Sequence, residues 1–256
     1  MIAKRVSRNR WRFAQYHERL HQEQKARSLP SREPALLRQA AENSARVSAF
    51  LDQLGYPVSD GLVVEVGAGA HGLIWKWPAE LRIAIDPLAA FYRRAFAVLQ
   101  ADGPAVVAAR GEQLPIQDAT VDIVLSDNVL DHVQDPASYL TECRRILRRT
   151  GVFFFTVDVH HPVYWWLGVL YNALFHTGLR LVVPAFPPHP FHFSERRVQR
   201  HLAQCGFRIV WRTAGDAGWL ANSDRLARGG ALRRTFTRMF WKNTRLEMVA
   251  VPAAEL

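Results

Sequence analysis

Cysteine and lysine are scarce in this 256-residue chain. Its two cysteines, Cys143 and Cys205, lie far apart and form neither a C-x-x-C pair nor a Cys/His cluster with zinc-site spacing. Their number and separation exclude a disulfide framework and favour two small core hydrophobes in a reducing compartment. Lysine is rare, so arginine supplies almost all of the positive charge.

The sequence also lacks an apolar leader, an internal repeat and a low-complexity tract. The N-terminal stretch MIAKRVSRNRWRF is basic and has no apolar core of a signal peptide, which predicts a cytoplasmic protein. Hydrophobic residues make up 49% of the chain, enough for a sizeable core and too many for a disordered chain. The length suits one large domain or two small ones.

Negative charge is in deficit, with a formal net charge of +10 and a pI near 10.3. Such an excess favours anionic partners, namely nucleic acid, anionic lipid or a phosphorylated substrate. A general bias toward arginine explains it nearly as well. No RNA- or DNA-binding motif is present, which disfavours nucleic acid as the partner.

The pattern of apolar residues predicts an α/β fold. We expect a Rossmann-like, seven-stranded, mostly parallel sheet with helices on both faces, plus an N-terminal helical extension and an inserted lid. Residues 1–34 form a basic extension that SLPSREP separates from a domain at 35–256, with the insertion at about 160–193. The expected strands are 62–66, 81–86, 105–109, 121–127, 151–159, 207–211 and 246–251, and the helices 35–55, 87–100, 135–151 and 194–206.

The stretch VEVGAGAHG follows the first strand and contains G-x-G-x-x-G at Gly67, Gly69 and Gly72. Glycines allow a tight turn and a close approach to a cofactor, of either the nicotinamide or the adenosylmethionine type. Asp86 ends the second strand and can accept both ribose hydroxyls of either cofactor. Glu65 can face an ammonium group, which S-adenosylmethionine has and NAD lacks. Glu65 therefore favours S-adenosylmethionine.

The stretch from Gly111 to Gly151, GEQLPIQDATVDIVLSDNVLDHVQDPASYLTECRRILRRTG, adds a specific pattern. It resembles the class I S-adenosylmethionine-dependent methyltransferases, specifically the small-molecule type 11 group, and WRFAQYHE near the N-terminus is similar to the opening of some members. The matching positions are Glu112, Leu114, Pro115, Asp118, Asp122, Val124, Ser126, Asn128, Leu130, His132, Val133, Asp135, Pro136, Leu140, Glu142, Arg145, Leu147 and Gly151.

The resemblance and the motifs together give a set of cofactor-binding residues. They are Glu65, Gly67, Ala68, Gly69, Gly72, Asp86, Pro87, Gly111, Glu112, Gln113 and Asn128. The chain departs from the family pattern at Arg110, where an aspartate is common, and in a glycine loop that is one residue longer. These departures support an alternative in which the domain binds cofactor weakly and serves as a non-catalytic partner subunit.

Methyl transfer needs alignment of the nucleophile, and an oxygen or nitrogen nucleophile also needs a base, for which histidine is suited near pH 7. The predicted candidates are His160, His192 and His132. With Asp158, His160, His161, His189 and His192 could instead bind a metal, but their spacing matches no familiar pattern, so no metal is predicted.

Two segments suggest what the acceptor is. The apolar stretch VYWWLGVLYNALFHTGLRLVV is near membrane-span length, but Asn172, His176 and Arg180 make it a lid or an interfacial platform rather than a span. ALRRTFTRMFWKNTR, at 231–245, mixes arginine with aromatic residues and fits either an anionic surface or a basic helix packed on the domain.

We therefore predict methyl transfer from S-adenosylmethionine to a small molecule, hydrophobic or lipid-linked if both segments meet a membrane. A cytoplasmic protein with peripheral membrane contact is then expected. A NAD-dependent oxidoreductase stays open as a further alternative.

Overall fold

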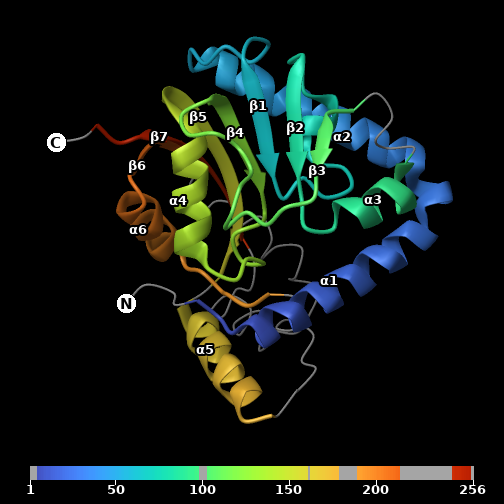
Figure 1. Cartoon of the computed structure of the whole chain (residues 1–256), viewed down its shortest axis with the longest axis vertical. Coiled ribbons are helices and arrows are strands. Elements are labelled where there is room, and N and C mark those ends of the chain that lie inside the picture. Colours follow the sequence, from blue (N-terminus) through green and yellow to red (C-terminus); the bar gives the residue numbers. More distant parts are fainter. Residues whose placement is uncertain (1–4, 98–102, 161, 179–188, 214–243, 255–256) are drawn as a thin grey trace, which may run out of the picture.

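The chain forms one seven-stranded sheet with helices on both faces (Figure 1). The computed structural model describes residues 5–97, 103–160, 162–178, 189–213 and 244–254. The strand order is β3-β2-β1-β4-β5-β7-β6, with β7 antiparallel to both neighbours and the other pairs parallel. The predicted Rossmann-like sheet is confirmed. The strands are β1 (Leu62–Val66), β2 (Leu81–Ile85), β3 (Ala105–Val107), β4 (Val121–Asp127), β5 (Leu147–Val159), β6 (Phe207–Arg212) and β7 (Thr244–Pro252).

Six α-helices and a short 3-10 helix belong to the described residues. Asp135 caps α4 as predicted, because its side chain accepts hydrogen bonds from the backbone N–H groups of Ala137 and Ser138. The helices are α1 (Arg8–Arg27), α2 (Leu29–Gln53), η1 (Leu73–Lys76), α3 (Ala89–Ala95), α4 (Pro136–Ile146), α5 (Pro162–His176) and α6 (Glu195–Gln204).

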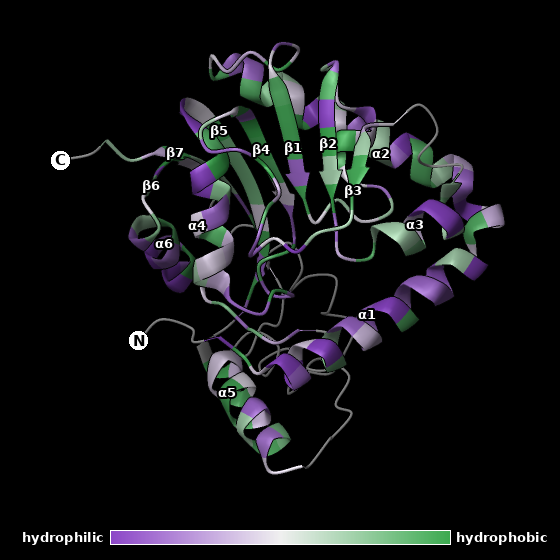
Figure 2. Cartoon of the chain, viewed as in Figure 1, coloured by the Kyte–Doolittle hydropathy of each residue, from purple (hydrophilic) through white to green (hydrophobic). Residues whose placement is uncertain are grey.

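Two hydrophobic cores lie on opposite faces of the sheet because successive strand residues point to opposite sides. Val63 of β1 packs with Val47 and Leu51 of α2, and all three side chains are fully buried. Its neighbour Val64 belongs to the other core, which α4 and α6 cover, together with Leu140. Figure 2 shows the hydrophobic colouring of the central strands between these helices. Packing on both faces holds the strands in place, so the positions of their carboxyl ends are fixed as well.

Several predicted helix and strand limits differ from the structure. The helix expected over 135–151 ends at Ile146, because Leu147 adopts an extended backbone and pairs with Val121 of β4. The helix predicted from residue 87 is described only over Ala89–Ala95, and the third strand is shorter than expected. The aromatic segment at 214–243 and residues 179–188 lie outside the described residues.

The N-terminal segment does not end at the predicted break. α2 begins at Leu29 and continues through Pro34, so the expected boundary at residue 34 lies within a helix. Pro30 occupies the first turn, where a missing N–H costs no helical hydrogen bond. Pro34 removes one bond a turn later, and the buried face of the helix, which includes Val47 and Leu51, offsets that loss.

α1 crosses the molecule below the carboxyl ends of β1 and β2, the ends marked by the arrowheads in Figure 1. Two hydrogen bonds with the loop before α4 hold Val6, just before the start of α1. The N–H of Val6 donates to the Gln134 carbonyl at 3.0 Å, and the Gln134 side chain donates to the Val6 carbonyl at 3.1 Å. The N-terminal segment therefore closes one side of the space at the strand ends.

Candidate active site

The glycine loop turns sharply after β1 and faces the carboxyl edge of the sheet. Gly67 and Gly69 have positive φ values of 83° and 56°, which favour glycine. The N–H groups of Gly67 and Ala68 donate to the Ile85 carbonyl, at 2.7 and 3.2 Å. A Cβ on Gly67 would lie 2.3 Å from a γ-methyl group of Val129. Hydrogen bonds thus hold the loop beside the end of β2, and close packing holds it against Val129.

Glu65 shapes the end of the same loop. Its buried carboxyl group accepts hydrogen bonds from the N–H groups of Leu73 and Ile74, at 3.2 and 2.8 Å. Burial raises the pKa of Glu65 to about 8. A Cβ on Gly72 would lie 2.4 Å from a Glu65 carboxyl oxygen, so this glycine leaves room for the carboxyl group. Glu65 also lines the pocket, and its contact with a cofactor ammonium group stays a prediction.

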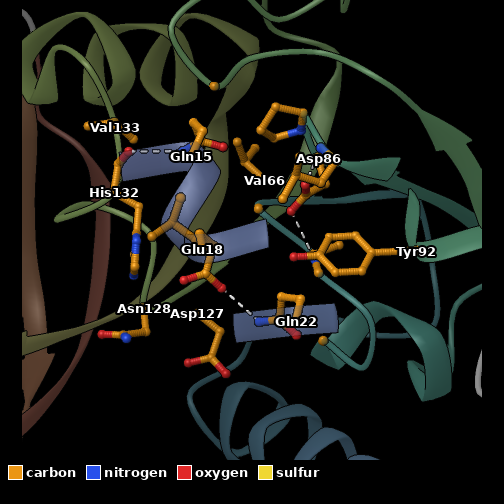
Figure 3. A pocket seen from close by; sticks show the side chains of 18 of the residues that line it. Gln15, Glu18, Gln22, Val66, Asp86, Tyr92, Asp127, Asn128, His132 and Val133 are labelled. Carbon is orange, nitrogen blue, oxygen red and sulfur yellow. Dashed lines mark hydrogen bonds between the residues drawn. The ribbon is translucent and has the colours of Figure 1, made fainter. Parts of the chain in front are cut away.

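Asp86 lies immediately after β2 and faces the glycine loop. One carboxyl oxygen accepts from the Gly69 N–H at 3.1 Å, and the other accepts from the Leu88 N–H at 2.7 Å. Burial raises the pKa of Asp86 to about 6. Figure 3 shows its side chain opposite α1, close to Tyr92. Asp86 also lines the pocket, and its contact with a ribose stays a prediction.

Arg110, Gly111 and Glu112 line the pocket beside the glycine loop. The Arg110 guanidinium lies over the ring of Trp11, 4.3 Å from its centroid. Arg110 also lies 3.1 Å from a Glu112 carboxyl oxygen, which itself accepts the Gln134 N–H at 2.6 Å. Of the residues predicted here, Gln113 is not among those lining the pocket.

Asn128 combines a structural role with a place in the pocket. Its φ of 58° is left-handed, and its side-chain oxygen accepts from the Asp158 N–H at 3.0 Å. It joins the end of β4 to the end of β5 and lines the pocket as well. The sequence allowed two interpretations of Asn128, a cap after the strand and a pocket residue. Its position fits both.

α1 supplies the wall that sequence reasoning missed. Gln15, Glu18 and Gln22 point from this helix toward the strand ends (Figure 3). Their spacing of three and four residues places them on one helical face. Gln15 donates to the His132 carbonyl at 3.5 Å, and Glu18 accepts from Gln22 at 2.7 Å. The similarity of WRFAQYHE to the opening of family members was the available signal.

The three histidines predicted as bases differ in position. His132 lines the pocket, whereas His160 and His192 are buried and are not among its lining residues. The rings of His160 and His192 lie 5.1 Å apart, and His192 lies 6.3 Å from His189. His189, which was predicted only as part of a histidine cluster, lines the pocket instead.

The pocket has a volume of about 710 Å³, within the range of small-molecule and cofactor sites. The glycine loop offers a close backbone approach, and Asp86 offers two acceptor oxygens for vicinal hydroxyls. These features fit the nucleoside and amino-acid parts of S-adenosylmethionine. Fold and site together are typical of Rossmann-like domains with a ligand pocket at the carboxyl edge of the sheet.

Comparison with known proteins narrows this class. Residues 64–155 match a family model described as "Methyltransferase domain". The chain is 46% identical over 41 residues to a "Probable S-adenosylmethionine-dependent methyltransferase" of Mycolicibacterium smegmatis, covering 16% of each chain. It is 27% identical over 110 residues to an uncharacterized protein of Methanocaldococcus jannaschii, covering 43% of this chain and 51% of the relative. The matches thus span about half or less of these relatives.

Solved structures agree in fold. Geranyl diphosphate C-methyltransferase from Streptomyces coelicolor superposes with a TM-score of 0.55 at 15% identity, over 82% of this chain and 79% of that chain. The YcgJ protein of Bacillus subtilis gives 0.56 at 15% identity, over 82% of this chain and all of that one. The predicted resemblance is confirmed over residues 64–155, where the chain matches the methyltransferase family model, and the solved structures agree with the fold.

Proposed function

We propose that this protein transfers the methyl group of S-adenosylmethionine to a small-molecule acceptor. The observation that carries the proposal is the placement of Asp86 against the glycine loop, in a pocket at the carboxyl edge of a methyltransferase-type sheet. Ligands of open α/β sheets bind at this edge. The proposed acceptor enters the same pocket, which α1 and the end of β4 enclose.

The sulfonium of the cofactor supplies an already activated methyl group. The protein then has to bind the cofactor and the acceptor, orient them toward each other and exclude water. Asp86 holds the ribose, and the backbone of the glycine loop lies against the amino-acid part. α1 covers the pocket and limits access of water. Of the three histidines predicted as base, His132 lines the pocket, which supports its choice as the base.

Titration calorimetry with S-adenosylmethionine, S-adenosylhomocysteine and NAD tests this function. We expect both adenosyl ligands to bind with dissociation constants on the order of micromolar and NAD to give no heat. Binding of NAD alone would establish the oxidoreductase alternative, which the G-x-G-x-x-G motif also permits. Failure of all three ligands to bind would favour the non-catalytic partner subunit.

We further propose that the acceptor is hydrophobic or lipid-linked. This rests on α5, where Trp166, Leu167, Val169 and Leu170 are between 43% and 66% exposed. α5 extends at the same end of the molecule as α1 (Figure 1). Arg10 of α1 donates to the Asn172 side chain of α5 at 2.8 Å. An exposed apolar patch on a helix that contacts α1, which lines the pocket, suits a membrane interface.

The described helices include none that is both long and apolar enough to cross a bilayer. Contact with a membrane would then be peripheral, through α5 and the positive charge of the chain. The second segment predicted to touch a membrane, 231–245, lies almost wholly outside the described residues.

Vesicle flotation tests the role of α5. We expect the protein to float with phosphatidylglycerol vesicles at low salt. The double variant Trp166→Ser/Leu170→Ser should bind at least about tenfold more weakly, since burying each such apolar side chain contributes about 1.5–3 kcal/mol. Leu81→Ser is the matched control, because Leu81 is 63% exposed on β2. Equal flotation of all three proteins, or none at low salt, would contradict the membrane proposal.

A further inference from the structure

A buried carboxylate and two imidazoles meet beside the pocket. Among the residues that the structure describes, Asp131, His132 and His189 offer ligand atoms that all lie within 4.8 Å of one another. A His189 ring nitrogen, Nδ1, lies 2.8 Å from Asp131 Oδ2, and His132 Nε2 lies 3.8 Å from Asp131 Oδ1. Atoms bound at 2.0–2.2 Å to one transition-metal ion have separations of about 3 Å to a little over 4 Å. Only small side-chain movements are needed to reach them.

Asp131 supplies a second and independent observation. Its side chain is 1% exposed, and within the described part of the chain its Oδ1 has no hydrogen-bond partner. An unpartnered oxygen on a buried carboxylate is costly, so such an atom calls for a ligand. Asp131 therefore offers a buried oxygen atom to a ligand bound between the two imidazoles.

Hydrogen bonds from several segments hold the backbone around Asp131 and His189. The Phe191 N–H donates to the Asp131 carbonyl at 3.4 Å, which ties the segment around His189 to the loop after β4. Arg10 of α1 donates to the His189 carbonyl at 3.2 Å, and Asn172 of α5 donates to the Pro190 carbonyl at 2.9 Å. Four separate segments thus meet at this cluster, as expected of a built site.

We propose that Asp131, His132 and His189 form a binding site for one divalent transition-metal ion such as Zn²⁺ or Fe²⁺. Two nitrogens and one carboxylate oxygen suit these ions, whereas Mg²⁺ and Ca²⁺ prefer oxygen ligands alone. His132 and His189 both line the pocket, so the remaining coordination positions face the space in which the acceptor is proposed to bind. Asp131 lies behind them as the buried ligand.

As a metal ligand, His132 cannot also be the base proposed for methyl transfer. A metal ion uses the imidazole lone pair that a base needs for its proton, so His132 cannot serve as base while it binds metal. Metal binding itself requires no acceptor and no cofactor. A measurement of Zn²⁺ affinity therefore tests the site separately from the methyltransferase function.

Calorimetric titration of the metal-stripped, tag-free full chain with Zn²⁺ is the decisive experiment. We expect one Zn²⁺ per chain at the tight site. Asp131→Asn, His132→Gln and His189→Gln should each weaken it by more than about tenfold, since even the outer partners of metal ligands contribute that much. His176→Gln is the matched control, because His176 is exposed on α5 and does not belong to the cluster. This variant should bind Zn²⁺ with the affinity of the unsubstituted chain.

Two outcomes would overturn the site. Equal Zn²⁺ binding by all variants would assign the metal to other histidines. Absence of Zn²⁺ binding by the unsubstituted chain would refute the site and leave His132 as the proposed base. If the variants fail to fold, the visible absorption spectrum of the unsubstituted chain with added Co²⁺ tests the site. We expect absorption bands that disappear when Zn²⁺ is added, and a featureless spectrum would refute the site. Loss of S-adenosylmethionine binding with Zn²⁺ binding intact would instead refute only the proposed function.

Discussion

Asp86→Ala is expected to weaken S-adenosylmethionine binding by more than about a hundredfold. A charge-assisted hydrogen bond contributes about 1.5–3 kcal/mol, and the predicted ribose contact makes two of them. Two such bonds correspond to a loss of at least about 3 kcal/mol in binding free energy. The variant also leaves the N–H groups of Gly69 and Leu88 without their acceptor, which loosens the loop. Calorimetry with S-adenosylmethionine and S-adenosylhomocysteine measures the loss.

Asp86→Asn separates the two causes of that loss. The amide keeps the size of the side chain and one acceptor oxygen, but it lacks the negative charge. An intermediate affinity, with a melting temperature close to that of the unsubstituted chain, would assign the loss to the ribose contact. Undiminished affinity in a well-folded Asp86→Ala variant would show that the ribose is bound elsewhere.

Gly67→Ala should cause a large loss of stability, and a larger one than Gly69→Ala in the same loop. The new Cβ would lie 2.3 and 2.8 Å from the two γ-methyl groups of Val129, so rotating that side chain cannot relieve both contacts. Overpacking of this kind costs about 1–3 kcal/mol, and a left-handed backbone adds about 1–2 kcal/mol. We expect the melting temperature to fall by more than about 5 °C.

Gly69→Ala is the matched control for that substitution. Gly69 also has a positive φ, of 56°, but apart from its two chain neighbours no described residue has an atom within 4 Å of the position of its Cβ. The variant should lose only the backbone contribution of about 1–2 kcal/mol. Thermal unfolding of both variants compares them directly. Equal melting temperatures would show that the contact with Val129 relaxes freely and that the loop is not held by close packing.

The sequence predicted the sheet well because local patterns determine it. Short apolar runs at 62–66 and 121–127 separated by helical segments require a parallel sheet covered on both faces. The position of Asp86 followed from the same regularity, since the carboxyl ends of adjacent parallel strands share one edge. The order of motifs over residues 111–151 then indicated the methyltransferase class, which the family match over 64–155 confirms.

Helix limits were predicted less well, because partners distant in sequence decide them. Nothing local distinguishes Leu147 from the helix before it, and its extended backbone follows from pairing with Val121 of β4. Pro34 was expected to break the chain, yet burial of Val47 and Leu51 against the sheet supports one helix through it. Tertiary packing overrides local propensity at both points.

The sequence by itself determined the strand-and-helix alternation, the glycine loop and Asp86, since each depends on residues near one another in the chain. Only the tertiary structure placed α1 over the pocket and brought His189 to Asp131, 58 residues away in sequence. It also showed that the predicted bases His160 and His192 are buried and are not among the residues that line the pocket. Contacts between distant segments form only when the sheet and its covering helices pack, so no local pattern records them.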